Sequence, residues 1–326
     1  MSETASERAS TEHTVLVVGE ALVDIIDREG SSATQEHVGG SPANVALTLG
    51  RLGHHSHLLA HLGQDARGRR IAEHLAGSHV HLVEGSIDPQ ATTSTAAAHL
   101  DAAGTARYEF DLNWRLPDPL PSLPEGTSCL HTGSIATTLS PGGDQVEGLV
   151  RTHRDAVTIS YDPNLRPAIM GSPEAVRDRV EALVALADVV KMSDEDAAWY
   201  EPGVDPEEIA TRWQSRGPAL VIVTRGGEGA VGFTGEGRVE IASKPISVVD
   251  TVGAGDTFSA GLIDGLAYAG LLGAANREAL HGVSLGAAKA IMEHAARLAA
   301  VTVSRAGADT PWRHEVYPRQ AQGARD

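Results

Sequence analysis

The chain has 326 residues, of which 41% are hydrophobic, a composition typical of one large α/β domain or two smaller ones. Its 26 basic and 43 acidic residues give a formal net charge of -17, which repels nucleic acid and anionic lipid, so we expect neither as a partner. The single cysteine, Cys129, excludes an internal disulfide framework, and we interpret it as a core residue. The polar segment 1–13 and the lack of a membrane-length apolar run agree with a cytoplasmic protein.

Strands and helices are predicted to alternate along the chain. The β-branched run 14–18 indicates a strand buried on both faces. A helix follows, with Ser41 as its cap and Gly53 at its end. Further strands are predicted at residues 157–161, 187–190 and 219–223. Strands that alternate with helices form parallel crossover units, so we predict an α/β fold with a mainly parallel central sheet flanked by helices.

Two segments interrupt this alternation. Residues 92–114 are rich in Thr and Ala without a helical pattern, and residues 229–249 read as hairpins. The first segment, with part of 20–38, is predicted to form a small β lid. No segment resembles a linker, so we predict one domain over 14–317. The tails 1–13 and 318–326 are predicted to be disordered.

The strongest chemical motif lies at residues 250–258. Gly253, Ala254 and Gly255 precede a predicted helix, and such small residues let the N–H groups of a helix N-terminus approach an anion closely. Asp256, in the first turn, is placed to accept a proton from an attacking hydroxyl during phosphoryl transfer. Taken alone, a tight turn followed by a helix-stabilising acid explains these residues equally well.

A second group consists of polar residues near the first predicted helix. Gly39 and Gly40 permit close backbone approach, and Asn44 lies in the first helical turn. Asp24 is a carboxylate inside an apolar strand-like run, where sugar hydroxyls would supply the donors it needs. Both residues are also compatible with purely structural roles, Asp24 in capping a turn and Asn44 in stabilising the helix start.

A third group, at residues 162–166, follows a predicted strand, where open α/β sheets bind ligands. Arg166 is suited to a transferring phosphate or an acidic substrate. Residues 227–232 match the dinucleotide fingerprint G-x-G-x-x-G, but a hairpin rather than a helix follows, so we dismiss the match. The 15 histidines show no metal-binding pattern and are interpreted as surface and loop residues.

Three motifs resemble those of a known family. Gly-Gly-Ser-Pro-Ala-Asn-Val-Ala at 39–46 and the segment 250–261 are similar to the two signatures of the ribokinase-like, or PfkB, carbohydrate kinases. Tyr-Asp-Pro-Asn-Leu-Arg-Pro at 161–167 resembles the bacterial fructokinase branch most closely. The resemblance runs from Val15 to Trp312. It implies a ribokinase-like fold whose β lid covers the sugar and often forms the dimer contact, so we expect a homodimer through the lid.

The resemblance also implies roles for individual residues. Asp256 would be the catalytic base, with an anion hole formed by Gly253, Ala254 and Gly255. The residues expected to hold the substrate are Asp24, Gly39, Gly40, Asn44, Asn164 and Arg166. The segment 224–229 would line the ATP site, and the residues expected to bind ATP are Ser193, Thr224, Gly226 and Gly229.

Metal contacts follow from the same resemblance. Many members carry an Asn-x-x-Glu motif that places magnesium and phosphates, and the matching positions here are Ser193 and Asp196. Asp196 keeps a carboxylate that is shorter by one methylene, so we expect it to contact Mg²⁺ through water. Members often bind K⁺ beside the anion hole, which implies a K⁺ site at the carbonyls of Asp250 and Val252 with the segment 302–307.

The leading functional hypothesis is transfer of phosphate from ATP to the primary hydroxyl of a free sugar, with fructose as the first candidate. The alternative, 2-keto-3-deoxygluconate kinase, would need cations beyond Arg166, and Arg107 and Arg115 of the lid are available. Asp24 would repel the carboxylate of that keto acid, so fructose is favoured. A ribose or nucleoside kinase ranks third. A catalytically silent sugar sensor is the alternative from another class, but a sensor would not need Asp256.

Overall fold

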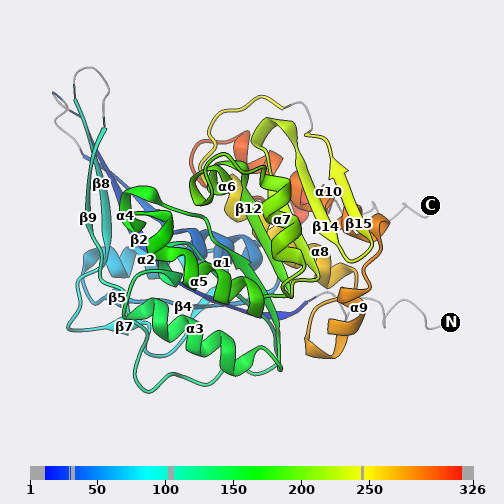
Figure 1. The fold of residues 1–326 in the computed structure, drawn as a ribbon. Coiled ribbons are helices and arrows are strands. Elements are labelled where there is room, and N and C mark those ends of the chain that lie inside the picture. The colour runs from blue at the N-terminus through cyan, green and yellow to red at the C-terminus, as the bar shows by residue number, and fades with distance from the viewer. Residues whose placement is uncertain (1–11, 29, 31–33, 102–105, 244–245, 318–326) are drawn as a thin grey trace, which may run out of the picture.

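The computed structural model describes residues 12–28, 30, 34–101, 106–243 and 246–317. Its body is built on a nine-stranded sheet of order β15-β14-β13-β12-β11-β10-β1-β4-β6 (Figure 1). Neighbouring strands from β6 to β13 are parallel, and β14 and β15 are antiparallel. The strands are β1 (Thr14–Val18), β4 (His55–Leu59), β6 (Val80–Leu82), β10 (Thr127–Gly133), β11 (Thr158–Asp162), β12 (Val189–Ser193), β13 (Leu220–Thr224), β14 (Ala230–Thr234) and β15 (Gly237–Ile241). The predicted mainly parallel sheet is confirmed.

Helices cover both faces of this sheet. The helices on one face are α1 (Ser41–Arg51), α2 (Ala66–Ala76), α8 (Ala254–Tyr268) and α10 (Leu285–Val303). Those on the other face are α3 (Gly142–His153), α5 (Pro173–Leu186), α6 (Asp194–Tyr200) and α7 (Pro206–Gln214). Shorter elements are α4 (Pro167–Met170), α9 (Arg277–His281), α11 (Arg313–Val316), η1 (Ser134–Thr137), η2 (Gly226–Glu228) and η3 (Ala274–Asn276).

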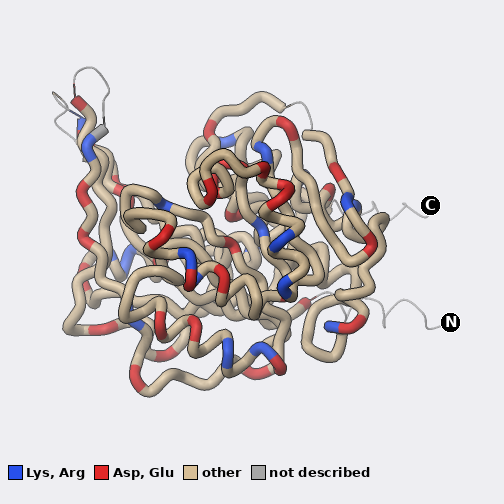
Figure 2. The backbone as a smooth tube through the Cα atoms, in the orientation of Figure 1, with Lys and Arg blue, Asp and Glu red and all other residues tan. Residues whose placement is uncertain are grey.

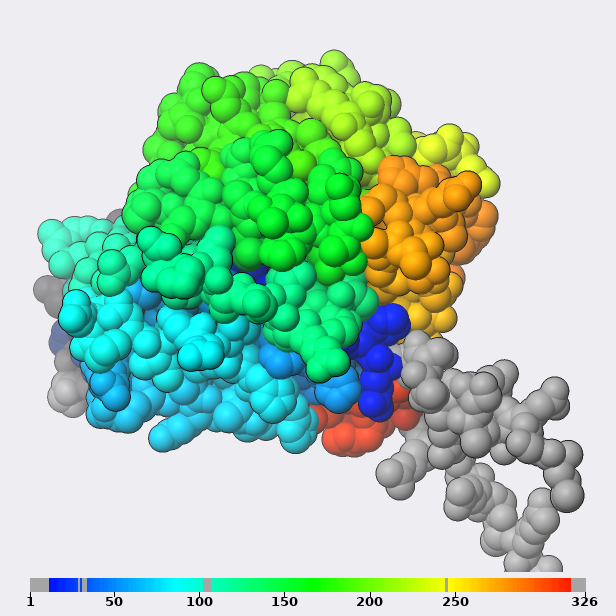
Figure 3. Space-filling model, turned by 90° about the horizontal axis from the view of Figure 1, so that it is seen from below, coloured from blue at the N-terminus to red at the C-terminus, as the bar shows by residue number. Residues whose placement is uncertain are grey.

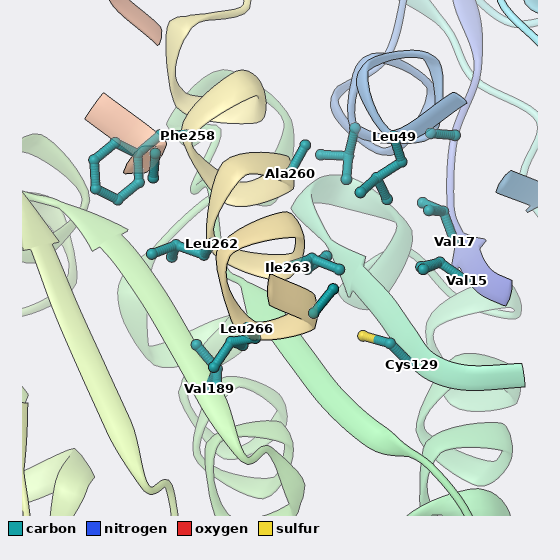
Figure 4. Packing of buried hydrophobic residues seen from close by; sticks show 14 of the residues in the cluster. Val15, Val17, Leu49, Cys129, Val189, Phe258, Ala260, Leu262, Ile263 and Leu266 are labelled. Carbon is teal, nitrogen blue, oxygen red and sulfur yellow. The ribbon is translucent and has the colours of Figure 1, made fainter. Parts of the chain in front are cut away.

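The core follows from the alternation of side chains along the strands. Val15 and Val17 of β1 point to the layer of α1 and α8, whereas Leu16 and Val18 point to the opposite layer. Figure 4 shows the first layer, in which Val15 and Val17 lie with residues of α1 and α8. Cys129 is fully buried in this layer, in agreement with its interpretation as a core residue.

A separate four-stranded sheet, of order β3-β2-β8-β9, rises from one corner of the body (Figure 1). Its strands are β2 (Leu22–Arg28), β3 (Gln35–Gly39), β8 (Thr95–Leu100) and β9 (Ala106–Asp111). Two antiparallel hairpins, β2–β3 and β8–β9, are joined through the parallel pair β2–β8. This sheet, called the lid below, lies where the small β lid was predicted. The strands β5 (Leu62–Gly63) and β7 (Ile87–Asp88) pair at its base.

Four sequence-based expectations concern the ends of single elements and of the chain. The prediction that Ser41 caps α1 is wrong, because Gly40 is the N-cap and no side chain caps this end. The strand expected at 187–190 begins two residues later, as β12. The hairpin expected at 229–249 forms as β14–β15, at the edge of the main sheet. Of the tails predicted at 1–13 and 318–326, residues 1–11 and 318–326 lie outside the described residues, whereas the backbone N–H of His13 donates to His54.

The interpretation of the histidines as surface residues is also wrong for several of them. His54 and His294 are buried and donate to the carboxylate of Asp264, at 2.9 and 2.6 Å from its Oδ1 and Oδ2. The hydroxyl of Tyr317 donates to the same Oδ2 at 2.8 Å. This network joins the loop after α1, the helices α8 and α10, and the last described residue. Within the described residues, no cluster of His, Cys, Asp and Glu is suited to hold a metal.

Charged residues are distributed over body and lid rather than gathered in one basic patch (Figure 2). Seen from below, the cyan segment around α2, the green segments of α3 and α5 and the orange segment around α9 form one continuous surface (Figure 3). Within the described residues, we find no helix with the length and apolar character needed to cross a membrane.

Candidate active site

The predicted site residues gather at the carboxyl edge of the parallel strands. β11 ends at Asp162, β12 at Ser193 and β13 at Thr224, and Ser193 and Thr224 are direct partners in the sheet register. In parallel sheets this edge receives ligands, because the loops that follow every strand meet there. The sheet therefore brings together motifs that are about 30 residues apart along the chain.

The start of α8 supplies the predicted anion hole. Gly253 is the N-cap residue, with φ of 75°, and the helix begins at Ala254. A Cβ atom on Gly253 would lie 2.7 Å from the Cβ of Ala308, so a side chain fails here on both conformational and steric grounds. The unpaired N–H groups of a helix start attract negative charge. The predicted turn and helix start are therefore present, and their geometry is suited to an anion.

Asp256 lies in the first turn of α8 with only 8% of its surface exposed. Its Oδ1 accepts a hydrogen bond from the hydroxyl of Ser41 at 2.7 Å, and its Oδ2 accepts one from the amide of Asn44 at 2.8 Å. Burial raises the pKa of Asp256 above its ordinary value, and the hydrogen bonds from Ser41 and Asn44 oppose this rise. A carboxyl whose pKa lies above the usual range is a stronger proton acceptor, as a general base requires.

A buried ion pair lies next to the start of α8, and the sequence analysis missed it. The ammonium of Lys191, on β12, is 3.0 Å from Oδ2 of Asp162, which also accepts from the hydroxyl of Ser259 at 2.9 Å. Lys191 and Asp162 are 5% and 1% exposed. A lysine between Val190 and Met192, in a strand buried on both faces, was the signal that pointed to such a pair.

On the lid side, Asp24 of β2 lies against the β3 strand. A Cβ atom on Gly39 would come within 2.0 Å of Oδ2 of Asp24, so a side chain at position 39 would displace this carboxylate from its present position. Burial raises the pKa of Asp24, while the positive charges of His37 and Arg166 oppose the rise. Gly40, with φ of 106°, links β3 to α1. The lid carboxylate therefore lies close enough to Arg166, in the motif after β11, to be affected by its charge.

Glu20, two residues after the end of β1, is a second residue that the sequence analysis missed. It is 6% exposed, and its Oε2 accepts from the backbone N–H of Ala136 at 3.2 Å. Burial raises its pKa to about 7, against hydrogen bonds from Ser134 and Ala136 and the charge of Arg166. An acid two residues after a buried strand was the signal in the sequence.

The loop after β11 carries the other two predicted substrate residues. Asn164 has φ of 39°, is 9% exposed, and its Nδ2 has no hydrogen-bond partner within the described part of the chain. An unpartnered buried amide is costly unless a ligand or water completes it. Arg166 is exposed and donates to the carbonyl of Leu165. The loop thus presents one amide and one guanidinium beside the site.

Ser193 and Asp196 form a reciprocal capping box at the start of α6. Oδ2 of Asp196 accepts from the N–H of Ser193 at 2.9 Å, and Oδ1 accepts from the N–H of Leu165 at 2.7 Å. Each oxygen keeps one lone pair after these bonds. This geometry fits the predicted contact with Mg²⁺ through water, because Mg²⁺ commonly keeps several waters and binds few carboxylates.

The segments expected to hold K⁺ are brought together. The carboxylate of Asp250 accepts from the N–H of Val252 at 3.0 Å and from the N–H of Gly307 at 2.9 Å. The N–H of Val249 donates to the carbonyl of Val303 at 2.8 Å. The loop before the anion hole is thus tied to the end of α10, which fits a carbonyl-lined cation site.

The segment expected to line the ATP site forms a tight turn between β13 and β14. Thr224 ends β13 beside Ser193, and the N–H of Arg225 donates to the carbonyl of Gly229 at 2.8 Å. Gly226 and Gly229 have φ of 48° and 98°, which favour glycine. The G-x-G-x-x-G match within 227–232 therefore belongs to a hairpin, as the sequence analysis argued.

Comparison with known proteins places these features in a family. The family model described as "pfkB family carbohydrate kinase" matches residues 12–315. A fructokinase of Rhizobium leguminosarum bv. trifolii is 34% identical over 264 residues, covering 79% of this chain and 81% of the relative. Among solved structures, fructokinase of Xylella fastidiosa with bound ATP has a TM-score of 0.78 and 25% identity, covering 90% of this chain and 93% of that one. Fructokinase of Vibrio cholerae O395 with fructose, ADP and calcium has a TM-score of 0.75 and 28% identity, covering 91% and 95%. The chain therefore belongs to the PfkB family of carbohydrate kinases and is an ATP-dependent sugar kinase with the ribokinase-like fold.

Proposed function

We propose that this kinase phosphorylates the primary hydroxyl of fructose, with Asp256 as the general base. The observation that carries the proposal is the placement of Asp256: a buried carboxylate in the first turn of α8, held by Ser41 and Asn44. A base in this position accepts the hydroxyl proton at one end of the transfer, while the N–H groups of Gly253 to Gly255 face the anionic phosphates.

Hydrogen bonds, rather than ion pairs, hold the sugar. Asp24 accepts hydrogen bonds from sugar hydroxyls, and Asn44 exchanges its bond with Asp256 for one with the sugar or shares it. Gly39 and Gly40 leave room for the ring, and Asn164 and Arg166 border the acceptor. Fructose bound in the Vibrio cholerae relative and the curated fructokinase relatives support this choice of sugar.

ATP binds along the ends of β12 and β13, at Ser193, Thr224, Gly226 and Gly229. Mg²⁺ accompanies its phosphates, where it neutralises charge during transfer, and Asp196 contacts it through water. A potassium ion beside Asp250 and Val252 would fix the backbone of the anion hole without entering the chemistry. We further propose a cytoplasmic homodimer assembled through the lid, on which Tyr108 is 59% exposed and stacks on Phe110.

Two observations favour fructose over 2-keto-3-deoxygluconate. The guanidinium of Arg115 is engaged by Asp88 at 2.5 Å, and the side chain of Arg107 is 81% exposed on the lid. A substrate carboxylate would therefore meet Arg166 and the repulsive Asp24.

ATP consumption measured across a sugar panel tests the choice of substrate. We expect the highest kcat/KM with fructose, below it ribose and nucleosides, and little turnover with the keto acid. A higher kcat/KM for 2-keto-3-deoxygluconate would overturn the assignment, and no turnover with any sugar would favour a sensor.

The Asp256→Asn variant tests the base, because it keeps shape but cannot accept the proton. We expect kcat to fall by about 10²–10⁴-fold, with KM for both substrates little changed. Asp144→Asn is the matched control: Asp144 is also the third residue of its helix, α3, but its side chain is 60% exposed and bonded to Ser140 and Arg179. Retention of more than about a tenth of kcat in Asp256→Asn would refute the base role.

A further inference from the structure

The ion pair next to the start of α8 is almost completely buried. Asp162 ends β11 and Lys191 lies in β12, and both are buried beneath the first turn of α8. Oδ2 of Asp162 takes hydrogen bonds from Lys191 and Ser259, whereas Oδ1 has no partner among the described residues. Buried pairs of this kind contribute little stability for their desolvation cost, so their retention calls for another explanation.

The ammonium of Lys191 lies directly against the anion-hole backbone. A Cβ atom built on Gly255 would be 3.0 Å from Nζ of Lys191, and no other atom is as near to that position. Gly255 stands between Ala254 and Asp256, at the centre of the turn that faces the phosphates. The absence of a side chain at Gly255 therefore leaves room for the ammonium of Lys191 as well as for a bound phosphate.

The contact between Lys191 and the turn at Gly255 lies among several negative charges. Asp162 and Asp256 are two buried carboxylates at the same edge of the sheet, and the phosphates of ATP would bring further negative charge there. Burial alone lowers the pKa of Lys191, but attraction to Asp162, Asp196 and Asp256 outweighs it and leaves the pKa above its ordinary value. For Asp256, the charge of Asp162 adds to the rise in pKa that burial causes, and Lys191 opposes it. The neighbours from α1, Ser41 and Asn44, are uncharged.

We propose that Lys191 is a positioning residue for phosphoryl transfer, whose buried ammonium holds the turn at Gly255 and keeps Asp256 in the carboxylate form beside Asp162. The inference rests on the base role proposed for Asp256. Lys191 contacts neither substrate. It acts through the backbone that faces the phosphates and through the charge state of the base.

The test is the pH dependence of kcat in three variants, measured with saturating fructose and ATP. Lys191→Met removes the cation and leaves Asp162 uncompensated, so the midpoint of the acidic limb should move up by about one pH unit. Asp162→Asn leaves the cation unopposed, so the midpoint should move down. The double variant removes both charges, and its midpoint should return towards that of the wild type. Ser259→Ala removes a hydrogen bond to Asp162 without changing any charge and should leave the midpoint in place.

Lys191→Met is the variant most at risk of misfolding, because it strands a buried carboxylate. Asp162→Asn removes the main partner of the buried ammonium, but Asp196 and Asp256 still attract it, and the double variant leaves neither charge without its partner, so these two variants keep the proposal falsifiable. An unchanged midpoint in Asp162→Asn, or in a folded Lys191→Met, would overturn the role of Lys191 even if kcat fell. Failure of the base role is distinguishable, since Asp256→Asn would then remain active whatever the behaviour of Lys191.

Discussion

The side-chain amide of Asn44 donates to Oδ2 of Asp256 at 2.8 Å, although 212 residues separate the two in the chain. Asn44 lies in the first turn of α1, and Asp256 lies in the first turn of α8. The sequence assigned Asn44 to the sugar and Asp256 to proton transfer, and the hydrogen bond joins these roles. A change at position 44 should therefore affect the base as well as sugar binding.

The variant Asn44→Asp tests this coupling. It places a second carboxyl against Asp256, and two adjacent carboxyls share one proton, so the apparent pKa of the base rises. We expect kcat at pH 7 to fall by roughly 10–100-fold and to recover as the pH is raised. Ser41→Ala, which removes a hydrogen bond to Asp256 without adding charge, should give a smaller loss. An equal loss for Asn44→Asp at every pH would contradict the explanation.

Gly253→Ala should inactivate the enzyme. Its φ of 75° costs a non-glycine residue about 1–2 kcal/mol, and the added Cβ would collide with Ala308 at 2.7 Å, displacing the backbone that faces the phosphates. Gly270→Ala is the control, because Gly270 follows the same helix with φ of 68° but has no atom within 4 Å of its Cβ position. Both variants should show a lower Tm, but only Gly253→Ala should lose kcat. Equal activities would show that the turn does not contact phosphate.

Asp24→Asn should separate stability from sugar binding. Because burial raises the pKa of Asp24, its ionised form destabilises the empty protein, and this cost grows as the pH rises above the ordinary value of 3.8. Without sugar, the variant should therefore have a higher Tm than the wild type at pH 7 and the same Tm near pH 3. Its KM for fructose should increase about tenfold or more. Asp27→Asn, on the same strand, should leave KM unchanged, since Asp27 is half-exposed and pairs with His99. A lower Tm together with an unchanged KM would assign Asp24 to the fold alone.

Asp264→Asn should destabilise the protein without changing catalysis directly. Although burial opposes it, the hydrogen bonds from His294 and His54 leave the pKa of Asp264 well below its ordinary value of 3.8. The carboxylate therefore contributes stability that is fully present above pH 3.8 and is lost as the pH falls below it. In urea unfolding at pH 7 we expect a loss of about 2–4 kcal/mol. The difference in the free energy of unfolding between variant and wild type should become smaller at lower pH. A difference that does not change with pH would show that the ionised carboxylate is not its cause. Tyr317→Phe, which removes one hydrogen bond and no charge, should cost about 1 kcal/mol.

Much of the framework could be predicted from local patterns. The run 14–18 and the glycines around Ala254 indicated a buried strand and a helix start, because each pattern depends only on neighbours in sequence. The lid strands were also recognisable from the segment 92–114. These features are determined by residues that lie a few positions apart.

The features that could not be predicted from the sequence depend on which elements become neighbours in the fold. Lys191 was a lysine in an apolar strand, but its partner Asp162 follows from the adjacency of β11 and β12. Ser41 matched a helix cap, yet its hydroxyl turns to a carboxylate on α8 that no local pattern places there. His54 likewise lay in a histidine-rich stretch, whereas Asp264 pairs with it across 210 residues. Electrostatic partners in the core come from tertiary contacts, so a single sequence shows the charge without its counter-charge.

The lid is made of two hairpins, so the chain crosses between lid and body four times. One crossing passes through Gly40, whose neighbours on the body side are Ser41 and, three residues later, Asn44. Those two side chains hold the carboxylate of Asp256. A rotation of the lid about Gly40 would cover the sugar and would at the same time move Ser41 and Asn44, which hold Asp256. We expect binding of the sugar and positioning of Asp256 to occur in the same movement. This coupling would limit the hydrolysis of ATP by water while no sugar is bound.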